Sequence, residues 1–322
     1  MSGKDLRSGF MGTPEFAVAS LQQLVKGGYR VVGVITAPDK PAGRGRKLHE
    51  PAVKQFARRA GLPVLQPEKL RNPDFLAQLD ALKADLQVVV AFRMLPGQVW
   101  QMPRLGTFNL HASLLPQYRG AAPLNWAVIN GEKETGVTTF LLDHEIDTGK
   151  ILFREKILIG EDDTVGDVHD RLMELGAGLV VRTVEALAAG NYIALDQETL
   201  CSEPLKPAPK IYKGDCRIDW SASGGQIRNL IRGLAPWPGA WTELSGEDGQ
   251  RMTLKIYGAR LEPASGLIPG TIRTDGKEKL GIAASDGWLN FTDMQLSGKK
   301  RMSPAAFLRG FHGIGKYRAV IS

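Results

Sequence analysis

The chain has 322 residues, 43% of them hydrophobic and 23% charged, which is typical of a folded globular protein and too long for one ordinary core. No apolar run approaches the roughly 20 residues that a membrane-spanning helix needs, and the N-terminus lacks the apolar stretch of a signal peptide. Cys201 and Cys216 have neither the number nor the spacing of a disulfide framework or a zinc site. The sequence therefore predicts a cytoplasmic protein of two domains that holds no metal.

The net charge of +7 belongs to one part of the chain. Residues 1–206 contain 24 Lys and Arg against 24 Asp and Glu, whereas residues 207–322 contain 17 against 10, a difference of +7. A neutral first part joined to a basic second part indicates that the second part meets a polyanion such as nucleic acid. A plain solvated surface would have the same composition, so charge alone leaves both interpretations open.

The first elements along the chain predict a βαβ unit. An imperfect strand over 6–11 precedes an amphipathic helix that ends at Gly27, and an apolar strand covers 29–35. Residues 36–49 then show no periodicity, contain four cations and are long for a connection between a strand and a helix. We expect a loop there, which either binds phosphate groups or is a flexible loop exposed to solvent.

Strands and helices alternate from there to residue 189. Helices are expected over 51–60, 73–82, 123–130 and 164–189, and strands over 64–65, 86–91, 135–142 and 151–159, with one more that begins at Phe108. This alternation predicts an α/β domain built on a Rossmann-like open parallel sheet.

A proline-rich stretch over 204–209 predicts a stiff linker. Beyond it the sequence indicates one helix over 225–234 and short strands at 240–244, 252–259, 270–273, 279–283 and 288–294. Short strands separated by Gly, Asp or Ser favour a small OB-like β-barrel. The predicted organisation is a catalytic domain over 1–203, a linker over 204–209 and a second domain over 210–322.

Asn109, His111 and Asp147 are the candidate catalytic residues. Asn109 and His111 are two apart on a strand, so their side chains share one face, and Asp147 follows the next strand in an Asp-Thr-Gly loop. An imidazole beside a carboxylate can accept a proton from a nucleophile, and a carboxamide can donate to a developing oxyanion. These residue types predict transfer of an acyl group to a nucleophile that the substrate itself brings.

Three classes of enzyme fit the motifs poorly, namely serine hydrolases, HExxH metalloenzymes and dinucleotide-binding dehydrogenases, and a non-catalytic RNA-binding protein stays an alternative. Ser113 lies in Ala-Ser-Leu and not in the GxSxG elbow of a serine hydrolase. The sequence has no HExxH motif, and the first turn, with Gly12 alone and Pro14 behind it, lacks the GxGxxG of a dehydrogenase. An RNA-binding protein without catalysis would need the barrel but not the Asn109, His111 and Asp147 set.

Several segments resemble a known family: residues 10–17, 38–45, 109–123, 147–149 and 217–220. They are similar to the formyltransferases that use 10-formyltetrahydrofolate, over nearly the full length of the chain. The Pro-Ala-Gly-Arg-Gly run at 41–45 and the basic C-terminal part resemble the branch of that family that acts on methionyl-tRNA.

The resemblance implies transfer of the formyl group of 10-formyltetrahydrofolate to the α-amine of methionyl initiator tRNA, for translation initiation. It implies that Asn109, His111 and Asp147 are catalytic. It implies folate contacts from Phe92, Arg93, Met94, Leu95, Ser113, Leu114, Leu115 and Pro116. It implies tRNA contacts from Lys40, Arg44, Arg46 and Lys47 of the long loop.

We further expect the second domain to contact tRNA electrostatically, with little dependence on base sequence. The candidate residues are Lys210, Lys213, Arg232, Lys299, Lys300 and Arg301. A monomer is expected. The alternative function is formyl transfer to a small amine, such as a purine intermediate or an amino sugar nucleotide.

Three positions depart from the family's pattern. Ser8-Gly9 replace branched apolar residues in the first strand, which we expect to weaken an edge of the core by about 1–2 kcal/mol. Glu145 replaces a glycine of some relatives and affects the expected shape of the Asp147 loop. Arg93 replaces a glycine and resembles the enzymes that act on glycinamide ribonucleotide.

Overall fold

The computed structural model describes residues 2–42, 47–200 and 203–321. The chain forms two compact units. The first unit contains Met1–Gly120, Glu134–Ile157 and His169–Ala208, and the second contains Ala121–Lys133, Leu158–Val168 and Pro209–Ser322. The domain boundaries predicted from the sequence stay a prediction.

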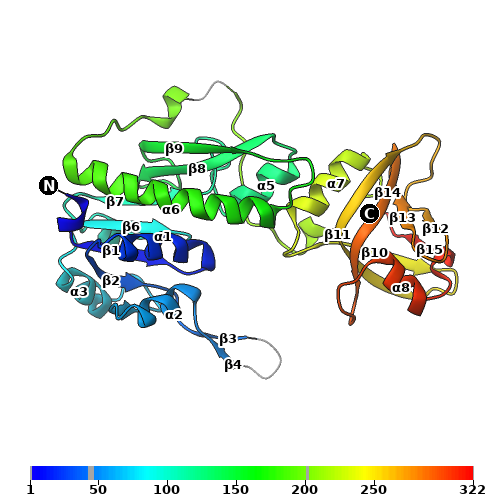
Figure 1. Ribbon diagram of the computed structural model, residues 1–322, viewed down its shortest axis with the longest axis horizontal. Helices are drawn as coiled ribbons and strands as arrows, with labels where there is room; N and C mark the ends of the chain where they lie inside the picture. Colours follow the sequence, from blue (N-terminus) through cyan, green and yellow to red (C-terminus); the bar gives the residue numbers. More distant parts are fainter. Residues whose placement is uncertain (1, 43–46, 201–202, 322) are drawn as a thin grey trace. The chain divides into compact units, whose positions relative to one another are not determined.

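The first unit is built on a seven-stranded sheet in the order β5-β2-β1-β6-β7-β8-β9 (Figure 1). Its strands are β1 (Ser8–Gly12), β2 (Val31–Ile35), β5 (Val64–Leu65), β6 (Leu86–Val90), β7 (Thr107–His111), β8 (Glu134–Leu141) and β9 (Ile151–Leu158). Pairing is parallel from β5 through β7, and β8 runs antiparallel to β7. The predicted Rossmann-like α/β sheet is therefore confirmed, with parallel pairing that stops at β7.

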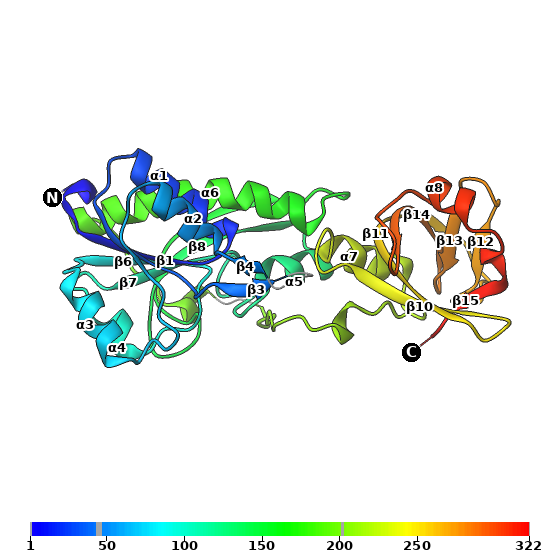
Figure 2. The same cartoon turned by 90° about the horizontal axis from the view of Figure 1, so that it is seen from below.

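Helices cover both faces of this sheet. They are α1 (Glu15–Lys26), α2 (Ala52–Arg59), α3 (Pro73–Ala81), α4 (Gly97–Trp100) and α6 (Val165–Ala189), with short 3₁₀ turns η1 (Gly3–Asp5) and η2 (Gln197–Leu200). Figure 2 shows α1 and α6 on one side of the sheet and α3 and α4 on the other. On the α3 side, Met11 and Val89 of the strands pack with Phe75 of α3 and Val99 of α4.

The side chains of β7 divide between these two faces. A Cβ at Gly176 of α6 would lie 2.7 Å from Leu110 Cδ2, so Leu110 faces α6. Because side chains alternate along a strand, Asn109 and His111 face the opposite side. The alternation predicted from Phe108 to His111 thus places the polar pair on the face that also carries α4.

The long segment over 36–49 contains a short ribbon that the sequence did not predict. Strands β3 (Lys40–Ala42) and β4 (Lys47–His49) pair antiparallel, with Lys40 opposite His49. Strands of three residues are too short to show a periodic pattern, and a proline lies in the first of them. Arg44 and Arg46 lie outside the described residues.

Strand β1 lies between β2 and β6, so Ser8 and Gly9 occupy the middle of the sheet. The expectation that they weaken an edge of the core was wrong about their position. The Ser8 side chain is fully buried, and its hydroxyl has no hydrogen-bond partner among the described residues.

The second unit is a nearly closed antiparallel barrel with the strand order β12-β13-β14-β11-β10-β15. Its strands are β10 (Ala240–Gly246), β11 (Arg251–Pro263), β12 (Ile272–Thr274), β13 (Leu280–Ala283), β14 (Gly287–Leu296) and β15 (Tyr317–Ala319). A bridge between Thr271 and Arg318 connects the two edges of the sheet. The predicted OB-like barrel is confirmed, although its last strand was missed.

Helices and turns complete the second unit: α5 (Pro123–Ile129), α7 (Gly224–Gly233), α8 (Pro304–Gly310), η3 (Gly214–Cys216) and η4 (Ile314–Lys316). Trp220 is fully buried in the barrel core, and its indole N–H donates to the Thr242 hydroxyl at 2.9 Å. A large aromatic side chain with its one donor satisfied is a strong anchor for a small core.

Candidate active site

His111 ends strand β7 and is held by the loop that follows it. The side chain is buried, and its Nε2 lies 2.9 Å from the backbone carbonyl oxygen of Tyr118. Because a carbonyl oxygen only accepts, Nε2 must carry the hydrogen. Nδ1 is therefore the nitrogen that is left to exchange a proton.

Asp147 reaches His111 from the loop after β8. Its Oδ2 lies 3.8 Å from His111 Nδ1 and accepts a hydrogen bond from the Gly120 backbone N–H at 3.0 Å. The structure thus brings together the two residues that the sequence paired. A distance of 3.8 Å exceeds that of a hydrogen bond, however, so the Tyr118 carbonyl fixes the orientation of the imidazole.

Asn109 completes the predicted set on the same face of β7 as His111. Its backbone lies between Val89 of β6 and Phe140 of β8. The side chain is half-buried, and its amide makes no hydrogen bond to the protein among the described residues. A carboxamide held by a central strand with its donors unused is suited to bind a substrate oxygen.

The segment Ser113–Pro116, predicted to contact folate, makes its hydrogen bonds and apolar contacts within the protein, to its own loop and to the neighbouring strands β8 and β9. The Thr138 hydroxyl donates to the Ser113 carbonyl at 2.6 Å, and the Ser113 hydroxyl donates to the Gln117 carbonyl at 2.7 Å. Leu115 is fully buried against Phe140 and Ile151. These contacts give the segment a supporting role for the loop that holds His111, and contact with folate stays a prediction.

Gly120 has a backbone that no other residue type fits well. Its φ is +127°, and an added Cβ would overlap the Ala208 carbonyl oxygen. The close contact with the Ala208 backbone fixes the position of the Gly120 backbone. Because the Gly120 N–H donates to Asp147 Oδ2, this contact also helps to position the Asp147 carboxylate.

The other predicted folate contacts follow strand β6. Phe92 and Arg93 line a pocket of about 370 Å³ together with residues of the first two βα turns. The Arg93 guanidinium donates to the backbone carbonyls of Pro67 and Glu68, so it connects the segment after β6 to the segment after β5. Met94 is 69% exposed, whereas Leu95 is buried in the core beside α4.

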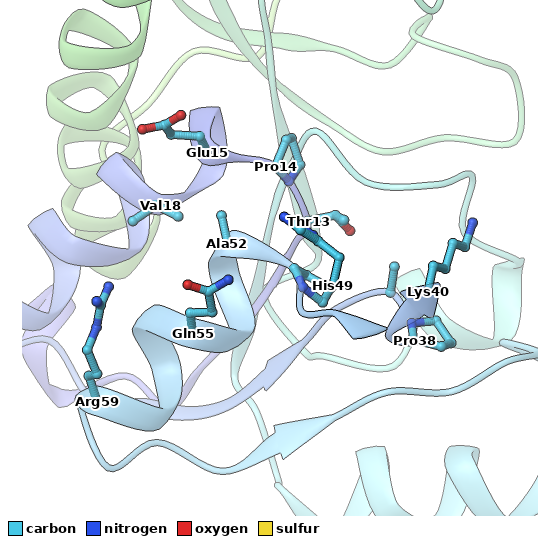
Figure 3. Close-up of a pocket in the computed structure, with 12 residues that line it drawn as sticks. Thr13, Pro14, Glu15, Val18, Pro38, Lys40, His49, Ala52, Gln55 and Arg59 are labelled. Atoms are coloured by element: carbon cyan, nitrogen blue, oxygen red, sulfur yellow. The ribbon is translucent and has the colours of Figure 1, made fainter. Parts of the chain in front are cut away.

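A larger pocket of about 690 Å³ lies at the start of α1 (Figure 3). Lys40 and His49 of the β3–β4 ribbon and Arg59 of α2 line it, with Glu15 as the acidic residue. Two cations, Lys40 and Arg59, thus face one carboxylate in a lining that is otherwise neutral apart from His49, and Lys40 is a predicted tRNA contact. The side chain of Lys47 is not described.

The loop of Asp147 tolerates Glu145. The Glu145 side chain is exposed, and its backbone does not adopt a positive φ. In this loop the positive φ belongs to Asp147, at 56°. Glycine is therefore not needed at 145.

The predicted tRNA contacts of the second unit differ in their surroundings. Lys210, Lys213, Lys299 and Lys300 are exposed. Arg301 is exposed but pairs with Asp293 through Nε at 2.6 Å. Arg232 is only 8% exposed, and its guanidinium binds Asn229 and the carbonyls of Gly160 and Asp163. Arg232 therefore lacks the exposed side chain that a tRNA contact requires, and it is not among the residues that we propose to bind tRNA.

Sequence reasoning missed Gln197, which touches the Asp147 loop. Its Nε2 donates to the carbonyl oxygens of Asp147 and Gly149, both at 2.8 Å. Gln197 lies 50 residues from Asp147 in a polar stretch without a motif, so no local signal marks it.

The described residues contain no cluster of three His, Cys, Asp or Glu side chains arranged to hold a metal ion. In the same part of the chain, no helix is both long and apolar enough to cross a membrane.

Comparison with known proteins identifies the class that this fold and site define. The formyl transferase family model matches residues 7–184, and the formyl transferase C-terminal domain model matches residues 210–312. A crystal structure of WlaRD, described as a sugar 3N-formyl transferase, shares the fold at a TM-score of 0.63 and 19% identity, and the match covers 92% of this chain and 99% of that one. The class is therefore a formyl transferase with two domains.

Curated relatives identify the branch. The methionyl-tRNA formyltransferase of Parabacteroides distasonis is 58% identical over 98% of this chain and 99% of its own length. That of Flavobacterium johnsoniae is 51% identical over 95% and 96%. The chain belongs to the methionyl-tRNA formyltransferase family.

Proposed function

We propose that this protein transfers the formyl group of 10-formyltetrahydrofolate to the α-amine of methionine on initiator tRNA, giving N-formylmethionyl-tRNA for translation initiation. The observation that carries the proposal is the approach of Asp147 Oδ2 to His111 Nδ1 at the carboxyl edge of β7. It occurs in a chain 58% identical to a methionyl-tRNA formyltransferase.

In this proposal His111 handles the proton of the reacting amine. Nε2 is occupied by Tyr118, so Nδ1 accepts the proton that the amine loses as its nitrogen bonds to the formyl carbon. Asp147 stabilises the charged imidazole that results, because its carboxylate lies 3.8 Å away with little water around it. The proton is then available for the nitrogen from which the formyl group departs.

Asn109 is proposed to bind the formyl oxygen. Attack by the amine places negative charge on that oxygen. A hydrogen bond from a carboxamide N–H then stabilises the transition state more than the ground state, and the barrier falls. The unused amide donors of Asn109, beside His111 on one face of β7, support this role.

The folate co-substrate supplies the formyl group, and this chain would hold it near the end of β6. A pocket of about 370 Å³ with an aromatic ring at Phe92 supports the placement. A crystal structure of HypX from Aquifex aeolicus, described as a complex with tetrahydrofolic acid, shares the fold at a TM-score of 0.61 and 18% identity. No metal is part of the proposed mechanism.

The tRNA is proposed to contact the basic segment around the β3–β4 ribbon and the exposed lysines Lys210, Lys213, Lys299 and Lys300. The four lysines are exposed, so their ammonium groups can contact phosphate. We propose that the protein acts as a monomer in the cytoplasm, where initiator tRNA is charged and used.

The experiment offers three amines, Met-tRNA, free methionine and glycinamide ribonucleotide, to the protein together with 10-formyltetrahydrofolate. Formylation of Met-tRNA alone is expected. Transfer only to a small amine would replace the proposal with the alternative function, and no transfer to any of them would overturn both.

The same assay tests the residues. His111→Ala and Asp147→Ala are each expected to lower kcat by about 10²–10⁴, the usual size for an acid–base group and its charged partner. The matched control is His312→Ala, since His312 is exposed in the second unit and should leave kcat unchanged. Near-normal turnover of His111→Ala with intact folate binding would contradict the mechanism.

A further inference from the structure

Gln197 makes every hydrogen bond that its amide can form, and all of them go to the two loops of the candidate active site. The side chain is 3% exposed and begins η2. Its two N–H groups donate to the Asp147 and Gly149 carbonyls at 2.8 Å. Its oxygen accepts from Arg119 Nε at 3.0 Å and Nη2 at 2.8 Å.

The chemistry of the partners determines which way this amide points. Backbone carbonyls only accept and a guanidinium only donates, so reversing the amide would break all four bonds. Gln197 therefore has one orientation and joins the Asp147 loop to Arg119 with no freedom to adjust.

Both ends of this connection lead directly to the reacting groups. Asp147 has a φ of 56°, a left-handed conformation that costs about 1–2 kcal/mol in a residue other than glycine, and the bond to its carbonyl holds it there. Arg119 lies between Tyr118, whose carbonyl binds His111, and Gly120, whose N–H binds Asp147.

We infer that Gln197 is a positioning residue that sets the distance between the Asp147 carboxylate and His111 Nδ1. This inference rests on the proposed function, because it assigns Gln197 a role in the same formyl-transfer site. Without Gln197, the Asp147 backbone loses its partner, and both the loop and Arg119 become free to move.

The test compares Gln197→Leu, which keeps the size and loses all four bonds, with Gln197→Glu, which keeps acceptors for Arg119 and loses both donors to the Asp147 loop. Both variants are expected to lower kcat about 10- to 100-fold with each KM changed less than about 2-fold, since displacement of a reacting group by about 1 Å has effects of this size. The control is Glu198→Gln, an exposed neighbour in the same turn.

A double variant distinguishes positioning from a general loss of structure. If Gln197 acts through Asp147, then Gln197→Leu lowers kcat less than about 2-fold in an Asp147→Ala background. The same 10- to 100-fold loss in both backgrounds would overturn the inference.

Amide hydrogen exchange gives a second readout that needs no activity. The Gly120 N–H, bonded to Asp147, is expected to exchange at least about 10-fold faster in Gln197→Leu, while the amides of β6 keep their rates. Unchanged exchange at Gly120 would overturn the inference. Rates on Met-tRNA and on a small amine are measured in parallel, so a wrong acceptor would refute the proposed function and leave the role of Gln197 testable.

Discussion

His111 is oriented by a backbone carbonyl, and this arrangement frees the nearby carboxylate to respond to charge. Had Asp147 accepted a hydrogen bond from Nδ1, that nitrogen would carry a proton before the reaction began. With Nε2 bonded to Tyr118, Nδ1 has its lone pair available, and in the proposed mechanism Asp147 stabilises the charge only when a proton arrives. The proposed order of events thus follows from which ring nitrogen the fold occupies.

Arg232 is the residue whose surroundings differ most from its expected role. Its Nε donates to Asn229 at 2.8 Å, and Nη1 donates to the Asp163 carbonyl at 3.1 Å and the Gly160 carbonyl at 3.3 Å. We expect Arg232→Met, which keeps the length of the side chain but none of its donors, to lower the free energy of unfolding by about 2–3 kcal/mol. Urea denaturation measures this change.

The control for Arg232 is Arg309→Met on α8, where the side chain is exposed and the change is expected to stay within about 0.5 kcal/mol. Affinity for tRNA, measured where the Arg232 variant is folded, should change less than 2-fold. Normal stability together with weakened tRNA binding would make Arg232 a contact residue after all.

At the scale of elements, one lysine holds the base of the β3–β4 ribbon, where the chain enters β3 and leaves β4. Lys54 of α2 is buried except for 13% of its side chain and contacts Asp39 Oδ2 at 2.5 Å, just before β3. It also contacts Glu50 Oε1 at 3.1 Å, just after β4, and Gln66 donates to the other Asp39 oxygen at 2.8 Å. Two ion pairs that share one mostly buried cation fix where the ribbon leaves and re-enters the unit.

We expect Lys54→Met to raise the KM for tRNA several-fold and to accelerate amide exchange in the ribbon. The matched control is Lys83→Met, because Lys83 forms an exposed ion pair with Asp80 at 2.6 Å. An equal effect of the two substitutions would show that the ribbon does not depend on Lys54.

The pH dependence of this contact follows from the pKa shifts of its members. Hydrogen bonds from Lys54 and then Gln66 lower the pKa of Asp39 below its usual value, so its contribution to stability is present above about pH 4 and is lost as the pH falls through the lowered pKa. The bond to Asp39 raises the pKa of Lys54, so its contribution is lost only as the pH rises above about 10. The ratio of the exchange rates of Lys54→Met and the wild type, measured at the same pH, should therefore stay constant from pH 5 to 8.

At the scale of the whole molecule, the excess positive charge is confined to residues 207–322. Binding of a polyanion to such a surface releases counterions, so affinity falls with salt by a slope that counts the phosphate contacts. Lys299 and Lys300 are exposed, whereas Arg301 pairs with Asp293 and lies 4.3 Å from the centre of the Tyr257 ring.

We expect Lys299→Gln with Lys300→Gln to reduce the slope of log affinity for tRNA against log salt by about 1.5–2. Adding Arg301→Gln should change the slope little, because its charge is already paired. The control is Lys69→Gln with Lys83→Gln on the first unit, which should leave the slope unaltered. An unaltered slope in the first pair would favour a merely solvated surface.

Helices and strands were predictable wherever an apolar pattern ran for long enough. The strand at β6 and the helix at α6 have such patterns, and the structure confirms both within a residue or two. The β3–β4 ribbon, α8 and β15 were not predicted, because three to seven residues stabilised by neighbours elsewhere in the chain leave no period to read.

The class of fold and the branch of the family could be predicted from the sequence, because strand alternation and short motifs are local properties, and the same motifs marked Asn109, His111 and Asp147 as candidate catalytic residues. Only the tertiary structure decided that Tyr118 orients His111, that Gln197 holds the Asp147 loop and that Arg232 is buried. Each of these contacts joins segments that are separate along the chain, or uses a backbone group that every residue carries. A hydrogen bond to such a partner is fixed by packing and has no signature in the order of the side chains.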